Sequence, residues 1–266
     1  MFYIYLEVIN LFTLILFTLI CFEQIEKKVN LRKIIYFTSL TLLALLNYFE
    51  YYMFIKDEAS YLVTVVSLLV IIIITTFLVL SVFSFQFLRL RILFIPFFLI
   101  LFIFRIISLN ISVENPNNYL LDNNILIVHI LSSLLAYSFL TISTVTSFCI
   151  FIQSFYLKKM RTNNNLLTPL PSINESEVIT ISLLNFTVLL LSLSLVTGYF
   201  YFKEDSNNLE FFFNSKSLIS ILALLLITLI LTVRGLVGIS GQTMFKLIIL
   251  CYFLINFSYF GVKFLY

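Results

Sequence analysis

The sequence predicts an all-α protein, a polytopic bundle of about eight transmembrane helices, and three observations lead to this prediction. First, 61% of the 266 residues are hydrophobic and 11% are charged, with a mean hydropathy of +1.10. A soluble protein is about half apolar and about a quarter charged. Second, several uncharged runs reach the roughly 17–25 residues that cross a bilayer as helix. Third, these runs are apolar on every side, whereas the strands of a membrane barrel alternate apolar and polar residues.

Clusters of charge, asparagine and proline divide the chain into eight predicted spans. They are Phe2–Phe22, about Ile34–Tyr52, Tyr61–Phe85, Ile92–Leu109, Ile125–Leu157, Ile179–Phe202, Ser217–Val233 and about Phe245–Tyr266. Between the last two spans, glycine at every third position of RGLVGISGQ predicts a tight turn. No connection is long enough for a soluble domain. We therefore expect one integral membrane domain over 1–266, with four N-terminal spans in 1–109 and four C-terminal spans in 125–266.

Lysine and arginine are shared unevenly between the two sets of connections. Eleven lie beside the connections that follow the first, third, fifth and seventh spans, and five lie on the other side. Basic residues beside short loops are retained in the cytoplasm. Both termini are therefore predicted on the outer, periplasmic side of a bacterial inner membrane, which the chain crosses many times.

Composition and missing motifs exclude several classes of function. The net charge of +3 is modest and the basic residues are scattered, so nucleic acid is not an expected partner. The chain has no Walker loop, no G-x-S-x-G elbow and no metal-ligand cluster, so we expect no catalytic residues and no enzyme activity. The cysteines fall in or beside separate spans and are predicted to be small buried apolar residues: Cys21, Cys149 and Cys251.

The single histidine, His129, is the strongest candidate for a functional residue. It lies about one turn inside the outer end of the fifth span, and an ionisable group inside a membrane is a functional candidate because its burial is costly. In one interpretation its imidazole binds haem iron or another metal. In the other, it is an interfacial residue that makes one hydrogen bond. Small and hydroxylated residues share its helix face and permit close helix packing: Ser132, Ser133, Ala136, Ser143, Thr144 and Ser147.

Arg105, near the outer end of the fourth span, is a second candidate. It has the charge to neutralise a carboxylate on a ligand. We favour the alternative, in which it pairs with Glu114 or Asp122 or extends to the lipid headgroups. Glu7 admits the same two interpretations. Three intramembrane amides are predicted to form hydrogen bonds between helices: Asn47, Asn185 and Asn256.

The second half of the chain carries a series of segments in a distinctive order. They are HILSSLLAYSFLTIS, LLTPLPSI, LLLSLSLVTGYFYF, SKSLISILALLLITLILTVRGLVGISGQ and LINFSYFGVKFL. From about residue 120 to 266 this order resembles the cytochrome c assembly protein family, in particular its HemX/YpjD-like branch, which is related to the haem-handling CcsA and CcmC proteins.

The resemblance implies a membrane protein that holds haem transiently near the outer face, or supports haem attachment to apocytochromes. It implies His129 as an axial ligand of the iron and Arg105 as a partner of a haem propionate. Other family-like positions are structural: Tyr137, Lys216, Arg234, Gly198, Gly241 and Gly261. The chain departs from the family in having no tryptophan and in having Ser215 where a second outer histidine is expected. It therefore supplies one imidazole at most.

The leading functional prediction is a membrane-integral, haem-handling cytochrome c assembly protein. Its expected partners are the lipid bilayer, haem, and other cytochrome c maturation proteins or an apocytochrome. The alternative, from another class, is a small-solute or ion transporter or an accessory subunit of a membrane complex. His129 on an outward face distinguishes the two, because a transporter has no need of it.

The predicted orientation can be tested by labelling single cysteines with an impermeant reagent. A cysteine at Asn117 should react in intact cells, and one at Asn164 should react only after permeabilisation, because the two positions lie in connections on opposite sides. The reverse pattern would contradict the predicted topology.

Overall fold

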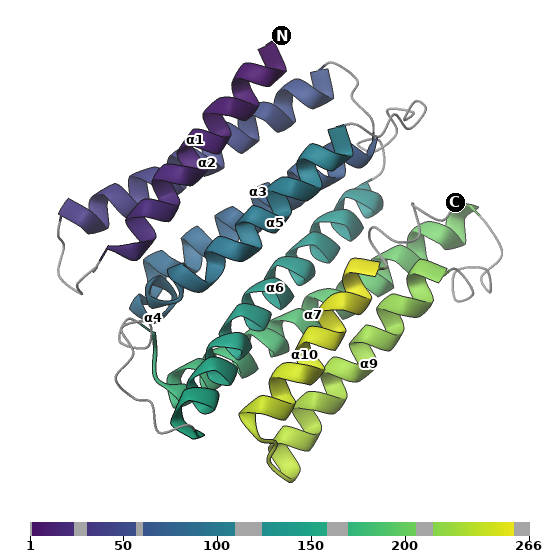
Figure 1. Cartoon of the computed structure of the whole chain (residues 1–266). Helices are drawn as coiled ribbons and strands as arrows, with labels where there is room; N and C mark the ends of the chain where they lie inside the picture. The colour runs from purple at the N-terminus through teal and green to yellow at the C-terminus, as the bar shows by residue number, and fades with distance from the viewer. Residues whose placement is uncertain are drawn as a thin grey trace. The chain divides into compact units, whose positions relative to one another are not determined.

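The computed structural model describes residues 2–23, 31–56, 61–109, 124–158, 170–205 and 215–257, and this part of the chain is helical without strands. Within these ranges, eight long helices correspond one to one with the eight predicted spans (Figure 1). They are α1 (Phe2–Phe22), α2 (Leu31–Lys56), α3 (Tyr61–Phe83), α5 (Arg91–Leu109), α6 (Asn124–Lys158), α7 (Ile173–Asp205), α9 (Ser215–Leu236) and α10 (Gly241–Asn256). A short helix, α4 (Phe85–Arg89), joins α3 to α5.

The helices have the length and composition of membrane spans. Among the described residues, five helices, α2, α3, α6, α7 and α9, are long and apolar enough to cross a bilayer. Two shorter apolar helices are Leu6–Phe22 and Gly241–Asn256. In hydrocarbon only helices and closed barrels satisfy the backbone hydrogen bonds. The predicted fold class, an all-α polytopic membrane bundle, is confirmed, and the placement of the termini on the outer side stays a prediction.

The chain divides into two compact units, and the first comprises Met1–Asn117 with Pro169–Pro171. In this unit α1 packs on α2, α2 on α3, α3 on α5, and α5 returns to α1, so the four helices form a ring. Buried aromatic rings fill its middle. Phe77 and Phe94 have ring centroids 3.8 Å apart, and Phe17 meets Phe98 edge-on at 5.7 Å.

The second unit comprises Asn118–Thr168 and Ser172–Tyr266. Here α6 packs on α7, α7 on α9, α9 on α10, and α10 returns to α6. The order of contacts along the chain is therefore the same as in the first unit. The broadest contact joins α6 to α7, and it is this contact that places His129.

Some helix boundaries differ from the predicted spans because of capping side chains. The sixth span was predicted to begin at Ile179, but α7 begins at Ile173. The reason is a capping box, in which the Glu175 backbone N–H donates to Ser172 Oγ at 3.3 Å and the Ser172 N–H donates to Glu175 Oε2 at 2.8 Å. The third span was predicted to reach Phe85, but α3 ends at Phe83 because the Ser84 side chain caps α4.

The turn between α9 and α10 is tight, as its glycines predict. Gly238 has φ of 80°, a left-handed conformation that favours glycine. Gly241, the first residue of α10, lies against α6, where an added Cβ would come within 2.4 Å of Ile150 Cγ2. The absence of a side chain at Gly241 therefore sets how closely α10 approaches α6.

This close approach predicts the effect of Gly241→Ala. The added methyl group should lower the stability of the purified protein by about 1–3 kcal/mol, the usual cost of overpacking. Gly235→Ala is the matched control, because no atom lies within 4 Å of its added Cβ. Thermal unfolding in detergent measures both variants, and the loss should shrink in an Ile150→Ala background. Equal melting temperatures for Gly241→Ala and Gly235→Ala would contradict this account.

Candidate functional site

His129 lies in the second turn of α6, partly buried, and its ring contacts α7. Its Nδ1 is 2.7 Å from the backbone carbonyl oxygen of Ser194. The Ser194 hydroxyl also lies 3.3 Å from the same nitrogen. Because a carbonyl oxygen only accepts hydrogen bonds, this contact assigns the proton of the neutral ring to Nδ1.

The consequence is a defined role for the other ring nitrogen of His129. With the proton on Nδ1, Nε2 keeps its lone pair, and no hydrogen bond to it is found among the described residues. A histidine that binds a metal usually donates its second N–H to a carbonyl or carboxylate, which fixes the ring and its tautomer. His129 therefore has the hydrogen bonding of a ligand that offers Nε2.

Along α6, which packs on α7, the predicted set of small and hydroxylated side chains is largely buried. Buried members of the predicted set are Ser132, Ala136, Ser143, Thr144 and Ser147, and Ser133 is partly buried. Their hydroxyls donate to carbonyls of α6 itself. Across the contact, the Thr180 hydroxyl donates to Thr146 Oγ1 at 2.7 Å. Small side chains at a helix contact let the two backbones approach closely.

Tyr137, predicted as a structural position, joins α6 to α10. Its hydroxyl donates to Asn256 Oδ1 at 2.6 Å and lies 3.3 Å from the hydroxyl of Tyr252. The predicted interhelical hydrogen bond of Asn256 is thereby confirmed. Asn185 differs, because it lies exposed on α7 and no hydrogen bond of its side chain is found in the described part of the chain.

The remaining family-like positions have structural surroundings. Arg234 forms an ion pair with Glu177 of α7 and donates to the Ile239 carbonyl at 3.0 Å, so it fixes the α9–α10 turn. Gly198 is buried in α7, and Lys216 is exposed near the start of α9. Gly261 lies outside the described residues. Glu177 was not recognised as a partner because it lies before the predicted start of its span.

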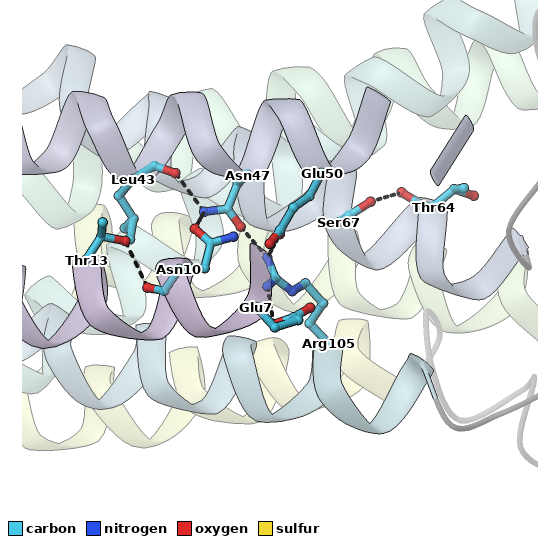
Figure 2. A network of polar contacts seen from close by, with 9 residues as sticks. All are labelled: Glu7, Asn10, Thr13, Leu43, Asn47, Glu50, Thr64, Ser67 and Arg105. Carbon is cyan, nitrogen blue, oxygen red and sulfur yellow. Dashed lines mark hydrogen bonds and ion pairs between the residues drawn. The ribbon is translucent and has the colours of Figure 1, made fainter. Parts of the chain in front are cut away.

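Arg105 has surroundings that differ from those favoured by the sequence. Its side chain is fully buried, so the prediction that it extends to the headgroups is wrong. Glu114 and Asp122, its other predicted partners, lie outside the described residues. In the structure its Nη2 lies 2.6 Å from Glu7 Oε2, and its Nη1 lies 2.5 Å from Glu50 Oε2 (Figure 2).

We call Glu7, Asn10, Asn47, Glu50 and Arg105 the charged cluster. Its members come from α1, α2 and α5 (Figure 2). Arg105 Nη1 also donates to Asn47 Oδ1 at 2.6 Å, which confirms the predicted interhelical bond of Asn47. The Asn47 amide then lies 3.5 Å from Asn10 Oδ1. A haem propionate would have to compete with two carboxylates at this guanidinium, and the predicted propionate role of Arg105 stays untested.

One feature of the sequence indicates the charged cluster. Glu7, Glu50 and Arg105 all fall near the outer ends of their predicted spans, and opposite charges at equal depth in a bundle tend to pair.

Arg91 was also missed as a structural residue. It is buried near the other end of α5, where its Nε donates to the Cys21 carbonyl at 2.9 Å and its Nη2 to the Glu23 carbonyl at 2.5 Å. It satisfies carbonyls at the end of α1.

The donor set of the described residues fits haem better than a free metal ion. No group of three or more histidine, cysteine, aspartate or glutamate side chains is arranged to hold a metal within the described ranges. The three cysteines are free and buried, as predicted. Haem supplies four nitrogen ligands of its own, so its iron needs only an axial group such as an imidazole. The Nε2 of His129 is a nitrogen atom of the kind that such an axial position takes.

Comparisons with known proteins extend the sequence resemblance. The model of the family described as cytochrome C assembly protein matches residues 34–266, so the likeness reaches into the first unit as well. A curated Azospirillum brasilense protein, described as an uncharacterized 28.8 kDa protein in nifR3-like 5'region, is 30% identical over 137 residues. That stretch is 52% of this chain and 50% of the relative, so the chain spans about half the length of the curated relative it matches. No solved structure matches.

The charged cluster predicts that Arg105→Met is strongly destabilising. The substitution leaves two buried carboxyl groups without their cation, and removing one partner of a buried ion pair costs about 3–5 kcal/mol. Thermal unfolding of the purified protein measures the loss. Arg32→Met is the control, because the ion pair of Arg32 with Glu23 is more than half exposed and should contribute little. A similar small effect in both variants would contradict a structural role for the cluster.

Proposed function

Because the chain belongs to the cytochrome c assembly protein family, we propose that it binds haem in the membrane and presents it to partner proteins for cytochrome c maturation. His129 is the axial ligand of the iron. The observation that carries the proposal is the Nδ1 contact with the Ser194 carbonyl, which leaves Nε2 as the donor atom. When bound, haem supplies the vinyl groups and the iron that a c-type cytochrome requires.

The residues around His129 orient the imidazole. The helix-bonded hydroxyls of α6 permit the close approach of α7, and this approach brings the Ser194 carbonyl within reach of the ring. The site works by holding and releasing its ligand, without catalytic residues. A single protein imidazole leaves the second axial position of the iron to a partner, which suits transfer better than permanent binding.

The proposed setting follows from the charge distribution. With both termini outside a bacterial inner membrane, the first turns of α6 lie near the outer face, where apocytochromes receive haem. The proposed partners are an apocytochrome and other maturation proteins, and the HemX/YpjD-like branch is the part of the family that the segment order of the second half resembles.

The proposal predicts that His129→Ala lowers the amount of mature c-type cytochrome in cells that carry no second copy of the gene. Loss of an axial ligand should reduce the haem-stained cytochromes by about 10-fold or more, as losses at metal sites commonly do. Haem staining of membrane fractions, normalised to the amount of this protein, gives the measurement.

The matched control is Ser133→Ala. It lies on the same helix one turn further on, and its hydroxyl only donates to the Ile130 carbonyl of α6 at 2.8 Å. The control should retain normal cytochrome levels. Unchanged cytochrome and unchanged haem content in His129→Ala would overturn the proposal.

A further inference from the structure

The charged cluster does not balance its own charge. It contains two carboxylates, Glu7 and Glu50, and one guanidinium, Arg105, with the ion-pair distances of 2.6 and 2.5 Å given above. The fourth helix of the ring, α3, has no charged residue. Among the cations of this unit whose side chains the structure describes, the others lie at the opposite ends of α2 and α5 or in α4: Arg32, Lys33, Arg89 and Arg91. With every group ionised, the cluster carries one negative charge.

Two carboxylate oxygens of the cluster also accept no hydrogen bond. Glu7 Oε1 and Glu50 Oε1 are both buried and have no donor in the structure. Asn10 and Glu50 are almost completely buried, and Figure 2 shows the Asn10 side chain pointing into the cluster. An uncompensated charge with unpaired oxygens is expensive in a medium of low dielectric constant. The cluster therefore lacks one positive charge and one hydrogen-bond donor.

A proton supplies both at once. It converts one carboxylate into a neutral group with an O–H donor, and it needs no coordination shell. A metal cation would need several more oxygen ligands, and the described residues hold no group suited to one.

We propose that the charged cluster is a binding site for one exchangeable proton, shared between the carboxyl groups of Glu7 and Glu50 and held against Arg105. The Glu7 side chain is 16% exposed and gives the proton its route of exchange, whereas the Glu50 side chain is 1% exposed. Binding involves no redox step, since a carboxylate oxygen takes the proton and the cluster becomes neutral. The charged cluster belongs to the first unit and His129 to the second, and this proposal stands whether or not the chain binds haem.

The infrared spectrum of the purified full-length protein tests the proposal. At about pH 7 exposed carboxyl groups are ionised, so a carbonyl stretch of a protonated carboxylic acid reports a proton held by the fold. We expect one such band in the wild type, and we expect it to shift in deuterated buffer because the proton exchanges. Absence of the band in the wild type would overturn the proposal without any variant.

Single substitutions distinguish a shared proton from the protonation of one residue. In either Glu7→Gln or Glu50→Gln, one carboxylate and one guanidinium remain, so the cluster is neutral and the band should disappear from both variants. Both keep the size of the side chain and a balanced charge, which favours correct folding. Glu23→Gln, at an exposed ion pair, should keep the band. Survival of the band in either cluster variant would overturn the shared site, as would a band that appears only when sodium and potassium are removed.

Discussion

Inside a hydrocarbon layer water satisfies no polar group, so each polar side chain that faces a neighbouring helix needs a partner within the bundle. In each unit the described helices place a polar pair at the contact that closes the ring. In the first unit Arg105 of α5 meets Glu7 of α1, and in the second Tyr137 of α6 meets Asn256 of α10. In both cases a helix late in its unit returns to the first helix of that unit. These polar contacts select which helices become neighbours, because apolar surfaces gain little from choosing each other over lipid.

The same requirement explains how a helix rich in serine and threonine places a histidine. Along α6 the hydroxyls donate to carbonyls one turn earlier, so these small side chains bring no unpaired hydroxyl to the helix contacts. The close contact with α7 presents the Ser194 carbonyl to His129. The orientation of the imidazole therefore depends on the packing of α7 on α6.

The hydropathy of the chain predicts much of this fold. Eight apolar runs became eight long helices, and the glycine-rich block became a turn with Gly238 in a left-handed conformation. The errors arose where single side chains act at short range. The capping box of Ser172 and Glu175 extends α7 into a segment that hydropathy assigns to the connection. The burial of Arg105 depends on its contact with Glu7, which lies 98 residues earlier in the chain. Hydropathy predicts the depth of a residue in the membrane, but it does not predict which helices are adjacent. His129 could be singled out from the sequence, whereas its contact with Ser194 required the packing of α6 on α7.

Binding of haem iron through Nε2 of His129 is tested most directly by the absorption spectrum of the detergent-purified protein from haem-supplied cells. Oxidised and reduced spectra of the wild type should show a Soret band, and His129→Ala should lose or shift it. Added imidazole should restore the wild-type band if the defect is the missing ligand alone. Identical spectra of the wild type and His129→Ala, or no band under conditions that load a related haem protein, would contradict the account.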